Sequence, residues 1–194
     1  MRQIPEREFD RFDGVPKSVR RRGVLELGDL PGEETEGGIQ VDLIPATMWG
    51  ENCRSVLTKR QWQYVSDYVR HRAGWQCEFC GAGNDFAAEK WLMAHERFVY
   101  DGNTMRLSAL ICICPKCNDV AHPGRAMSVI GKSLDQISRW YAEVAEIDRG
   151  EAVARMSQAT KDFNRRSDQE WNLDLTLIAP WVATIGQFES EGDR

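Results

Sequence analysis

The sequence has 194 residues, of which 42% are hydrophobic and 28% charged, with a net charge of −5. These values are typical of a globular protein, and no apolar run approaches the roughly 20 residues of a membrane-spanning helix. The N-terminal residues lack the apolar stretch of a secretory signal. We therefore expect a cytoplasmic protein without a membrane partner, in a compartment that keeps its six cysteines reduced.

The first half of the chain begins with a stretch rich in charge, Gly and turn-forming residues. Residues 1–40 are predicted to be a flexible arm with one short strand at 23–27. The apolar segment 41–49 is predicted to pack on the core. Thr58 has the position of a helix N-cap, and Gly74 is expected to end that helix just before the first cysteines.

The second half alternates strand and helix patterns. Short strands are predicted at Leu92–His95 and Leu107–Ile113. Ser133 begins a capping box for a helix through Ile147, and a second helix is predicted from about Glu151 to Trp171.

Four cysteines form two C-x-x-C pairs, CEFC and CPKC. This spacing lets both sulfurs of a pair reach one ion, and four thiolates close a tetrahedral shell without an open position for catalysis. A redox role would require only one pair beside a βαβ pattern, which is not visible. We therefore predict one structural Zn²⁺, and its ligands are Cys77, Cys80, Cys114 and Cys117.

Basic residues are concentrated between positions 54 and 75, although the sequence pI is about 5.3. An acidic protein is a poor candidate for binding nucleic acid over a wide surface, but a local basic face remains possible. The alternative is a solvated helix face without a partner. The candidate nucleic-acid-binding residues are Arg54, Lys59, Arg60, Arg70 and Arg72.

Several motifs taken together resemble the HNH nucleases. They are IPATMWGENCRSVLTKRQW, RHRAGWQCEFCG, MAHERFVYD, ICICPKCNDVAHPGRA and RRSDQEWNLDL, and they look like an uncharacterised bacterial and phage branch of that family. The likeness covers residues 41–177. It implies an α+β fold whose zinc-stabilised treble-clef or ββα-metal core follows one helix within an HNH-like domain at 41–132. Two further helices form an extension at 133–187 packed on that domain, and a frayed tail is expected at 188–194.

The resemblance also implies a catalytic site next to the zinc. In HNH nucleases a His acts as general base and one divalent cation steadies the scissile phosphate. The base maps to His95, and the ligand after the last knuckle maps to Asn118. Two further expected positions are occupied by Ala94 and Ala109, which cannot bind a cation or orient the base.

Replacement ligands for a second cation, such as Mg²⁺, Mn²⁺ or Ni²⁺, are available close to the base. The candidates are Glu96 and His122, and the second of these has capping of the finger as an equally plausible role. Three functions follow: a metal-dependent DNA endonuclease with a degenerate site, a non-catalytic DNA-binding module, and a protein-binding factor such as a phage-type inhibitor of a host protein. The two alanines argue against unimpaired cleavage, and the acidic charge favours a protein partner over a DNA-binding module.

Overall fold

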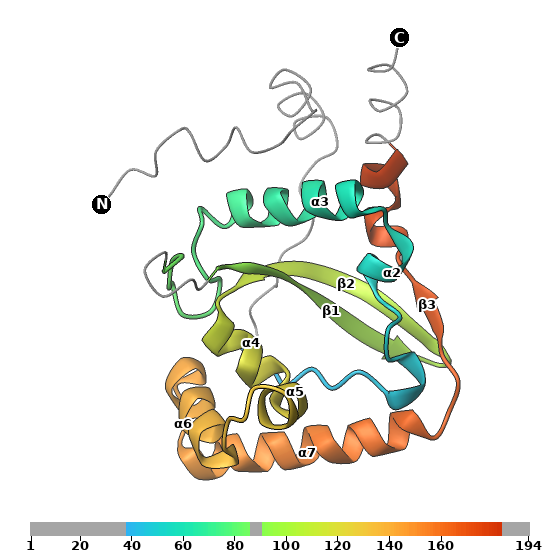
Figure 1. Cartoon of the computed structure of the whole chain (residues 1–194). Coiled ribbons are helices and arrows are strands. Elements are labelled where there is room, and N and C mark those ends of the chain that lie inside the picture. Colours follow the sequence, from blue (N-terminus) through green and yellow to red (C-terminus); the bar gives the residue numbers. More distant parts are fainter. Residues whose placement is uncertain (1–37, 86–90, 184–194) are drawn as a thin grey trace.

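The structure is a computed structural model that describes residues 38–85 and 91–183. The predicted strand at 23–27 and the predicted tail at 188–194 lie outside the described residues, as does nearly all of the predicted arm. Figure 1 shows a central β-hairpin with a helix on one side and a group of helices on the other. The predicted α+β class is confirmed.

The hairpin consists of β1 (Met93–Asp101) and β2 (Thr104–Ile113), which pair antiparallel. Both strands extend further toward the turn than predicted, because aromatic and β-branched residues continue the extended pattern as far as the turn. The turn contains Gly102 at φ +55, a left-handed conformation that glycine adopts without strain. A short strand, β3 (Asn172–Asp174), adds to β2 in parallel.

The elements before the hairpin are two short helices, η2 (Ala46–Met48) and α2 (Cys53–Val56), and the longer α3 (Lys59–Arg72). Helix α3 begins at the predicted N-cap, because the Thr58 side chain accepts a hydrogen bond from the Gln61 N–H. In Figure 1, α3 crosses the face of the hairpin opposite to the other long helices. Its buried residues pack against both long strands.

A short helix, η3 (Thr176–Ile178), follows β3, and four α-helices lie between the hairpin and β3, two more than predicted. They are α4 (Pro115–Ala121), α5 (Pro123–Ser128), α6 (Leu134–Ala145) and α7 (Arg149–Ser167). Ser133 caps α6 as predicted. Helix α7 ends before Trp171, whose indole N–H instead donates to the carbonyl of Arg166 at 2.8 Å as the chain turns back toward the sheet.

The core lies between the hairpin, α3 and α4. Strand β2 is its centre, since its last five residues, 109–113, are all buried. Helix α7 is peripheral and buries only Ala152 and Met156, which leaves much of its apolar face outside the core. Among the described residues, no helix has the length and apolar character needed to span a bilayer.

Candidate functional site

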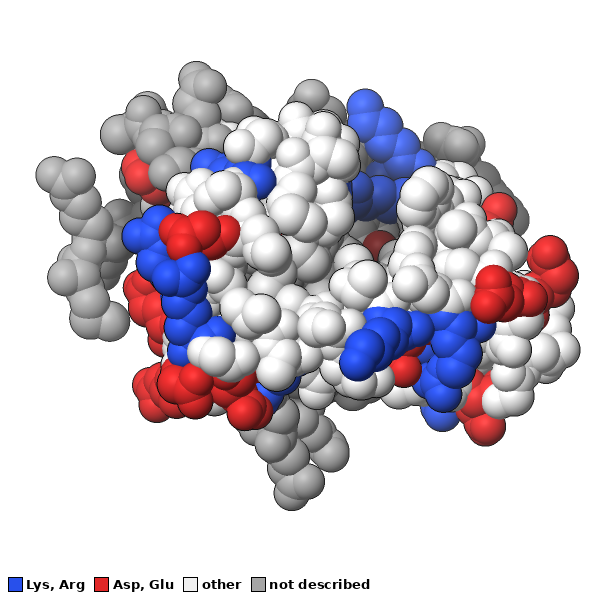
Figure 2. Space-filling model, turned by 90° about the horizontal axis from the view of Figure 1, so that it is seen from below, with Lys and Arg blue, Asp and Glu red and all other residues white. Residues whose placement is uncertain are grey.

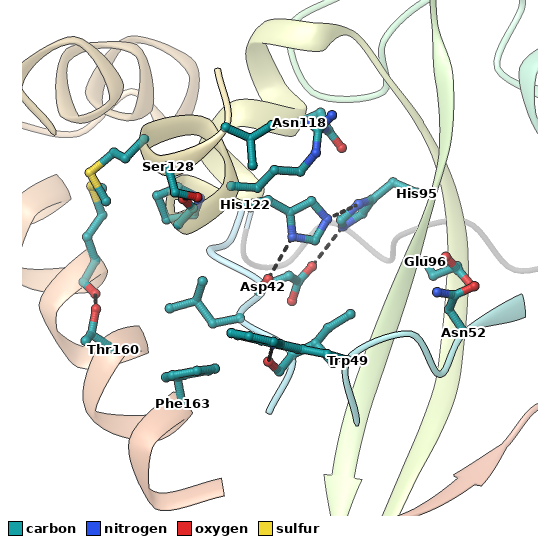
Figure 3. Close-up of a pocket in the computed structure, with 18 of the residues that line it drawn as sticks. Asp42, Trp49, Asn52, His95, Glu96, Asn118, His122, Ser128, Thr160 and Phe163 are labelled. Atoms are coloured by element: carbon teal, nitrogen blue, oxygen red, sulfur yellow. Dashed lines mark hydrogen bonds and ion pairs between the residues drawn. The ribbon is translucent and has the colours of Figure 1, made fainter. Parts of the chain in front are cut away.

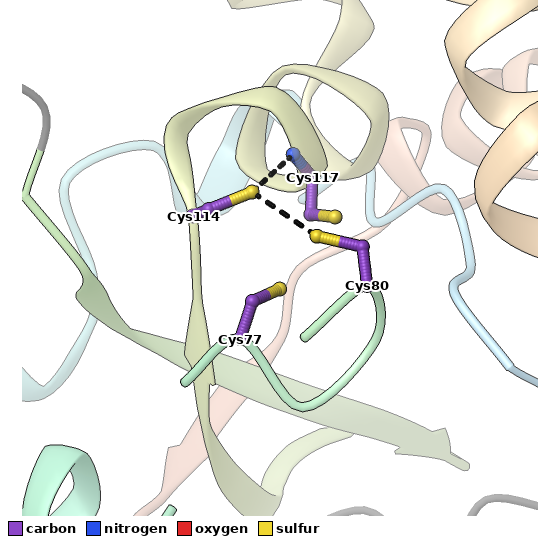
Figure 4. A group of neighbouring side chains, drawn as sticks. All are labelled: Cys77, Cys80, Cys114 and Cys117. Atoms are coloured by element: carbon purple, nitrogen blue, oxygen red, sulfur yellow. Dashed lines mark hydrogen bonds between the residues drawn. The ribbon is translucent and has the colours of Figure 1, made fainter. Parts of the chain in front are cut away.

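The four predicted cysteines come together where the hairpin meets α4 (Figure 4). Their sulfur atoms all lie within 4.8 Å of one another, and those of Cys80 and Cys114 are 3.6 Å apart. Four sulfurs at about 2.3 Å from one ion in a tetrahedron would be about 3.8 Å apart. Within the described part of the chain, this is the one group of three or more metal-binding side chains close enough to hold an ion.

Each cysteine pair is positioned by the backbone around it. Cys77 and Cys80 form a turn closed by a hydrogen bond from the Gly81 N–H to the Cys77 carbonyl at 2.9 Å, with Gly81 at φ +71. Cys114 directly follows β2 and is the N-cap of α4, so its sulfur accepts from the Cys117 N–H at 3.5 Å. The end of β2 and the start of α4 therefore bring Cys114 and Cys117 next to the first cysteine pair.

The electrostatics of the cysteine group favour a bound cation. Hydrogen bonds from Cys114 and Cys117 lower the pKa of Cys77. Hydrogen bonds to Cys114 and Cys77, together with burial, raise the pKa of Cys117. The group thus stabilises one thiolate but resists four negative charges in one small volume. A metal cation removes that repulsion, so these residues fit a metal ion.

A second cluster joins β1, the end of α4 and the segment before η2 (Figure 3). Nδ1 of His95 lies 3.2 Å from Nε2 of His122. The other ring nitrogen of His95, Nε2, lies 3.0 Å from Oδ2 of Asp42, and the other nitrogen of His122, Nδ1, lies 2.9 Å from the Asp42 carbonyl. A single residue therefore holds the outer nitrogens of both imidazole rings.

The local sequence explains how these three residues meet. The Asp42 N–H donates to the Ala121 carbonyl at 2.7 Å, which fixes the 38–45 segment along α4. His122 stands between α4 and α5, because the following Pro123 disfavours helical geometry at the residue before it. His122 accordingly has φ −119 and ψ 62, where its side chain lies against His95.

An ion pair and burial hold the side chains of this cluster in place. The guanidinium of Arg97 donates to Oδ2 of Asp42 at 2.6 Å, and Arg97 and His95 are only 6% and 5% exposed. Burial alone would raise the pKa of Asp42, but the hydrogen bond and charge of His95 and the charge of Arg97 outweigh it and lower that pKa. Burial and the neighbouring His95 lower the pKa of His122 to about 4.

The two rings lie at hydrogen-bond distance, and the same spacing would let both hold one cation if it replaced the shared proton. At neutral pH the His122 ring is uncharged, and because its Nδ1–H donates to a carbonyl, its Nε2 lone pair faces His95. Two nitrogens bound to one ion at about 2.1 Å lie about 3.0–3.4 Å apart, which matches the 3.2 Å between the rings. Histidines that bind metals usually donate their other N–H to a carboxylate or carbonyl, as Asp42 allows here.

The other residues considered for the catalytic site have different surroundings. Asn118 lines the same pocket and is one turn before His122 on α4. Glu96 is next to His95 on β1, but its Oε1 accepts from the Cys53 N–H at the start of α2 at 2.5 Å. Ala109 pairs with Arg97 across the hairpin rather than with His95.

Asp42 was missed in the sequence, although it takes the role of orienting His95. The resemblance placed that role on the second strand, at Ala109, whereas the carboxylate comes from a segment 53 residues before His95. The signal that was available is an acidic residue inside the apolar segment V-D-L-I. A charged residue in such a run requires a partner once the segment packs.

The five basic candidates are divided between structural contacts and the surface. Arg72 donates to Glu78 at 3.0 Å and to the Leu110 carbonyl at 2.8 Å, and Arg70 pairs with Asp67. Lys59 and Arg60, the first two residues of α3, are exposed. Arg54 is the member of this set that lines the pocket beside the histidines. The basic candidates therefore do not form one shared face around the site.

The histidine pair lines a pocket of about 980 Å³ between β1, α5 and α7. Figure 2 shows a hollow in the face seen from below, with Lys and Arg at one edge and mainly uncharged side chains around the rest. Searches of the chain against protein-family models, curated proteins and solved structures find no match.

Proposed function

We propose that this protein is a zinc-stabilised, metal-dependent phosphodiesterase of the HNH type that acts on nucleic acid. The observation that carries this proposal is the pair of histidine nitrogens 3.2 Å apart beside an open pocket. The order of elements supports it, since a cysteine turn, a hairpin, a second cysteine pair and a helix follow one another. The resemblance to HNH nucleases leads to the same treble-clef or ββα-metal arrangement.

Zinc is the ion proposed for the four cysteines. Four sulfur ligands and a closed tetrahedral shell suit Zn²⁺, and such a site stabilises the fold without taking part in chemistry. Its proposed role is to hold the hairpin against α4, which keeps His95 and His122 facing each other.

A second divalent cation, such as Mg²⁺, Mn²⁺ or Ni²⁺, is proposed between Nδ1 of His95 and Nε2 of His122. Bound there, it would supply Lewis acidity to a phosphate ester. Asp42 orients both rings, and Asn118, which lines the same pocket, is proposed to contribute a further oxygen. In this assignment His95 is a cation ligand rather than the expected general base, because its Nε2 faces Asp42 and its Nδ1 would be taken up by the cation, which leaves no nitrogen to accept a proton.

The proposal is tested by plasmid nicking and cation binding on the full chain. Purified protein with supercoiled plasmid and Mg²⁺, Mn²⁺ or Ni²⁺ is expected to nick DNA. His95→Ala and His122→Ala should each reduce the rate by about 100-fold or more, since a catalytic cation contributes several kcal/mol to transition-state stabilisation. His71→Ala is the matched control, because His71 is the third histidine of the chain and lies exposed on α3.

Calorimetric titration with Ni²⁺ separates binding from chemistry. Both site variants should lose the same binding event, and the His71 variant should keep it. Absence of cleavage of both the plasmid and a single-stranded oligonucleotide with every cation would rule out the enzymatic proposal. Nicking that survives His122→Ala would rule out the two-histidine cation site.

A second candidate function, a non-catalytic protein-binding factor, is favoured by the net charge of −5 and by the mainly uncharged side chains around the hollow in Figure 2. Such a protein would lack nicking activity and would retain one defined protein partner after nuclease treatment of the lysate. A non-catalytic DNA-binding module would instead bind duplex with strong salt dependence and without nicking.

A further inference from the structure

The pocket beside the histidines has one wall that the proposed hydrolysis does not use. Trp49 follows η2 and is 70% exposed, although it is one of the largest apolar side chains of the protein. Its indole N–H already donates to the Ile44 carbonyl at 3.2 Å. The ring therefore has no hydrogen bond left to offer a ligand, and what it presents is its aromatic surface.

The position of this ring is fixed from two sides. Phe163 of α7 lies beside it, with ring centroids 6.4 Å apart and planes only 22° from parallel. The short helix η2 is tied to the end of α7 by hydrogen bonds from the Ala46 N–H to Ser167 at 2.9 Å and from the Thr47 hydroxyl to the Gln169 carbonyl at 3.0 Å. Trp49 is thus a held, exposed platform rather than a side chain on a loose loop.

The same pocket reaches from this platform to the proposed cation site. Trp49 and Phe163 line it together with His95 and His122 (Figure 3). Its other walls include exposed apolar side chains of α5 and α7, and Ser157 and Asn118 add polar groups. Its volume of about 980 Å³ lies at the upper end of the range of small-ligand pockets.

The charges at the pocket suit an anionic chain. Arg54 and Arg125 both line it, and its two carboxylates are already engaged, since Asp42 is paired with Arg97 and Glu96 accepts from the Cys53 N–H. Two cations at a largely uncharged hollow provide contacts for one or two phosphates, but not the broad basic face that a duplex requires.

We propose that this pocket binds an unpaired nucleobase, stacked on Trp49, so that the substrate is single-stranded or locally opened nucleic acid. This inference rests on the proposed function, whose substrate class it specifies. Bases in a duplex are covered on both faces by their neighbours and expose only their edges. A ring that presents its face selects an unpaired base, and such stacking tolerates any base identity.

The test is fluorescence anisotropy with the full-length protein in buffer without added Mg²⁺. The probes are a short labelled single strand of mixed sequence, its duplex, and the same strand with abasic sites. The intact single strand should bind more tightly than the other two. Trp49→Ala should weaken its binding by about 5- to 150-fold, the range of one base stacked on one ring, and should leave duplex binding unchanged.

Two further variants separate stacking from folding. Trp49→Phe should stay within about threefold of the wild type, because a phenyl ring still stacks on a base. Trp91→Ala is the matched control, since Trp91 is 50% exposed and does not line the pocket; it should leave binding unchanged. Equal affinity for the intact and abasic strands, tighter binding of the duplex, or no binding of any probe would each overturn the inference.

The two proposals fail in different ways. Trp49-dependent binding of single strands without nicking would remove the hydrolysis and keep the base site. Nicking that does not depend on Trp49, with no preference for unpaired bases, would keep the hydrolysis and remove the base site. A peptide that occupies the pocket while every oligonucleotide fails to bind would point to the protein-binding alternative and overturn the inference.

Discussion

Asp42→Asn is the perturbation that tests the cluster most directly. Asparagine keeps the shape of the side chain and the main-chain carbonyl that accepts from His122, but it removes the negative charge that faces His95 and Arg97. The two partners are 4% and 8% exposed in their side chains, and Asp42 is 21% exposed. The contact is therefore largely shielded from water.

The expected loss in the free energy of unfolding follows from this burial. Breaking a fully buried ion pair costs about 3–5 kcal/mol. Because the Asp42 side chain is a fifth exposed, we expect a loss of about 2–3 kcal/mol in the free energy of unfolding. For a chain of this size that loss lowers Tm by about 4–12 °C. The measurement is thermal unfolding by circular dichroism at fixed zinc concentration and neutral pH.

Asp135→Asn is the matched control. Asp135 also faces two arginines, Arg139 and Arg149, but all three side chains are at least half exposed. Exposed pairs contribute about 1 kcal/mol or less, so Tm should fall by about 4 °C at most. Equal shifts for the two variants would refute the argument that burial makes the Asp42 network important. If the cation site is as proposed, Asp42→Asn should also weaken Ni²⁺ binding by about 10- to 100-fold.

Two further predictions concern the metal and the pH dependence. Purified protein should contain one zinc per chain, and Cys114→Ser should lose that zinc and unfold cooperatively at lower temperature. Cys53→Ala, which removes a buried cysteine outside the group, should keep the zinc. Zinc analysis and calorimetry measure both variants, and a full zinc content in the Cys114 variant would contradict the assignment. Burial raises the pKa of Tyr100 to about 12, so the neutral phenol stabilises the fold below pH 10 and this contribution is lost as the pH rises from 10 to 12. The wild type should therefore lose up to about 2 kcal/mol relative to Tyr100→Phe over that interval, as measured by urea unfolding, and parallel curves for the two proteins would contradict the pKa.

Features that depend on neighbours in sequence were predictable. The cap at Thr58, the cap at Ser133 and the two C-x-x-C pairs were all assigned from spacing, because hydrogen bonds within one helical turn and sulfurs within one short turn are fixed by local geometry. The end of α7 was predicted too late, since the chain leaves the helix to pair β3 with β2, a contact between distant segments that no local pattern encodes.

The second site was only half visible in the sequence. His95 and His122 stood out because they are two of three histidines next to strand and helix signals. Their partner did not, because Asp42 lies 53 residues before one ring and 80 before the other. Likewise, only packing showed that Glu96 supports α2 and that Arg72 is bonded to Glu78.

The sequence by itself thus predicted that Cys77, Cys80, Cys114 and Cys117 form one group that could hold a metal ion, since four cysteines at that spacing have few other uses. Only the tertiary structure decided which other side chains form a site near the four cysteines. The docking of the 38–45 segment on α4 brings the Asp42 carboxylate to His95, and the turn of the chain after α7 holds η2 and the exposed ring of Trp49 over the same pocket. Contacts between distant segments depend on how whole faces pack, and a residue pattern within a single segment carries no record of them.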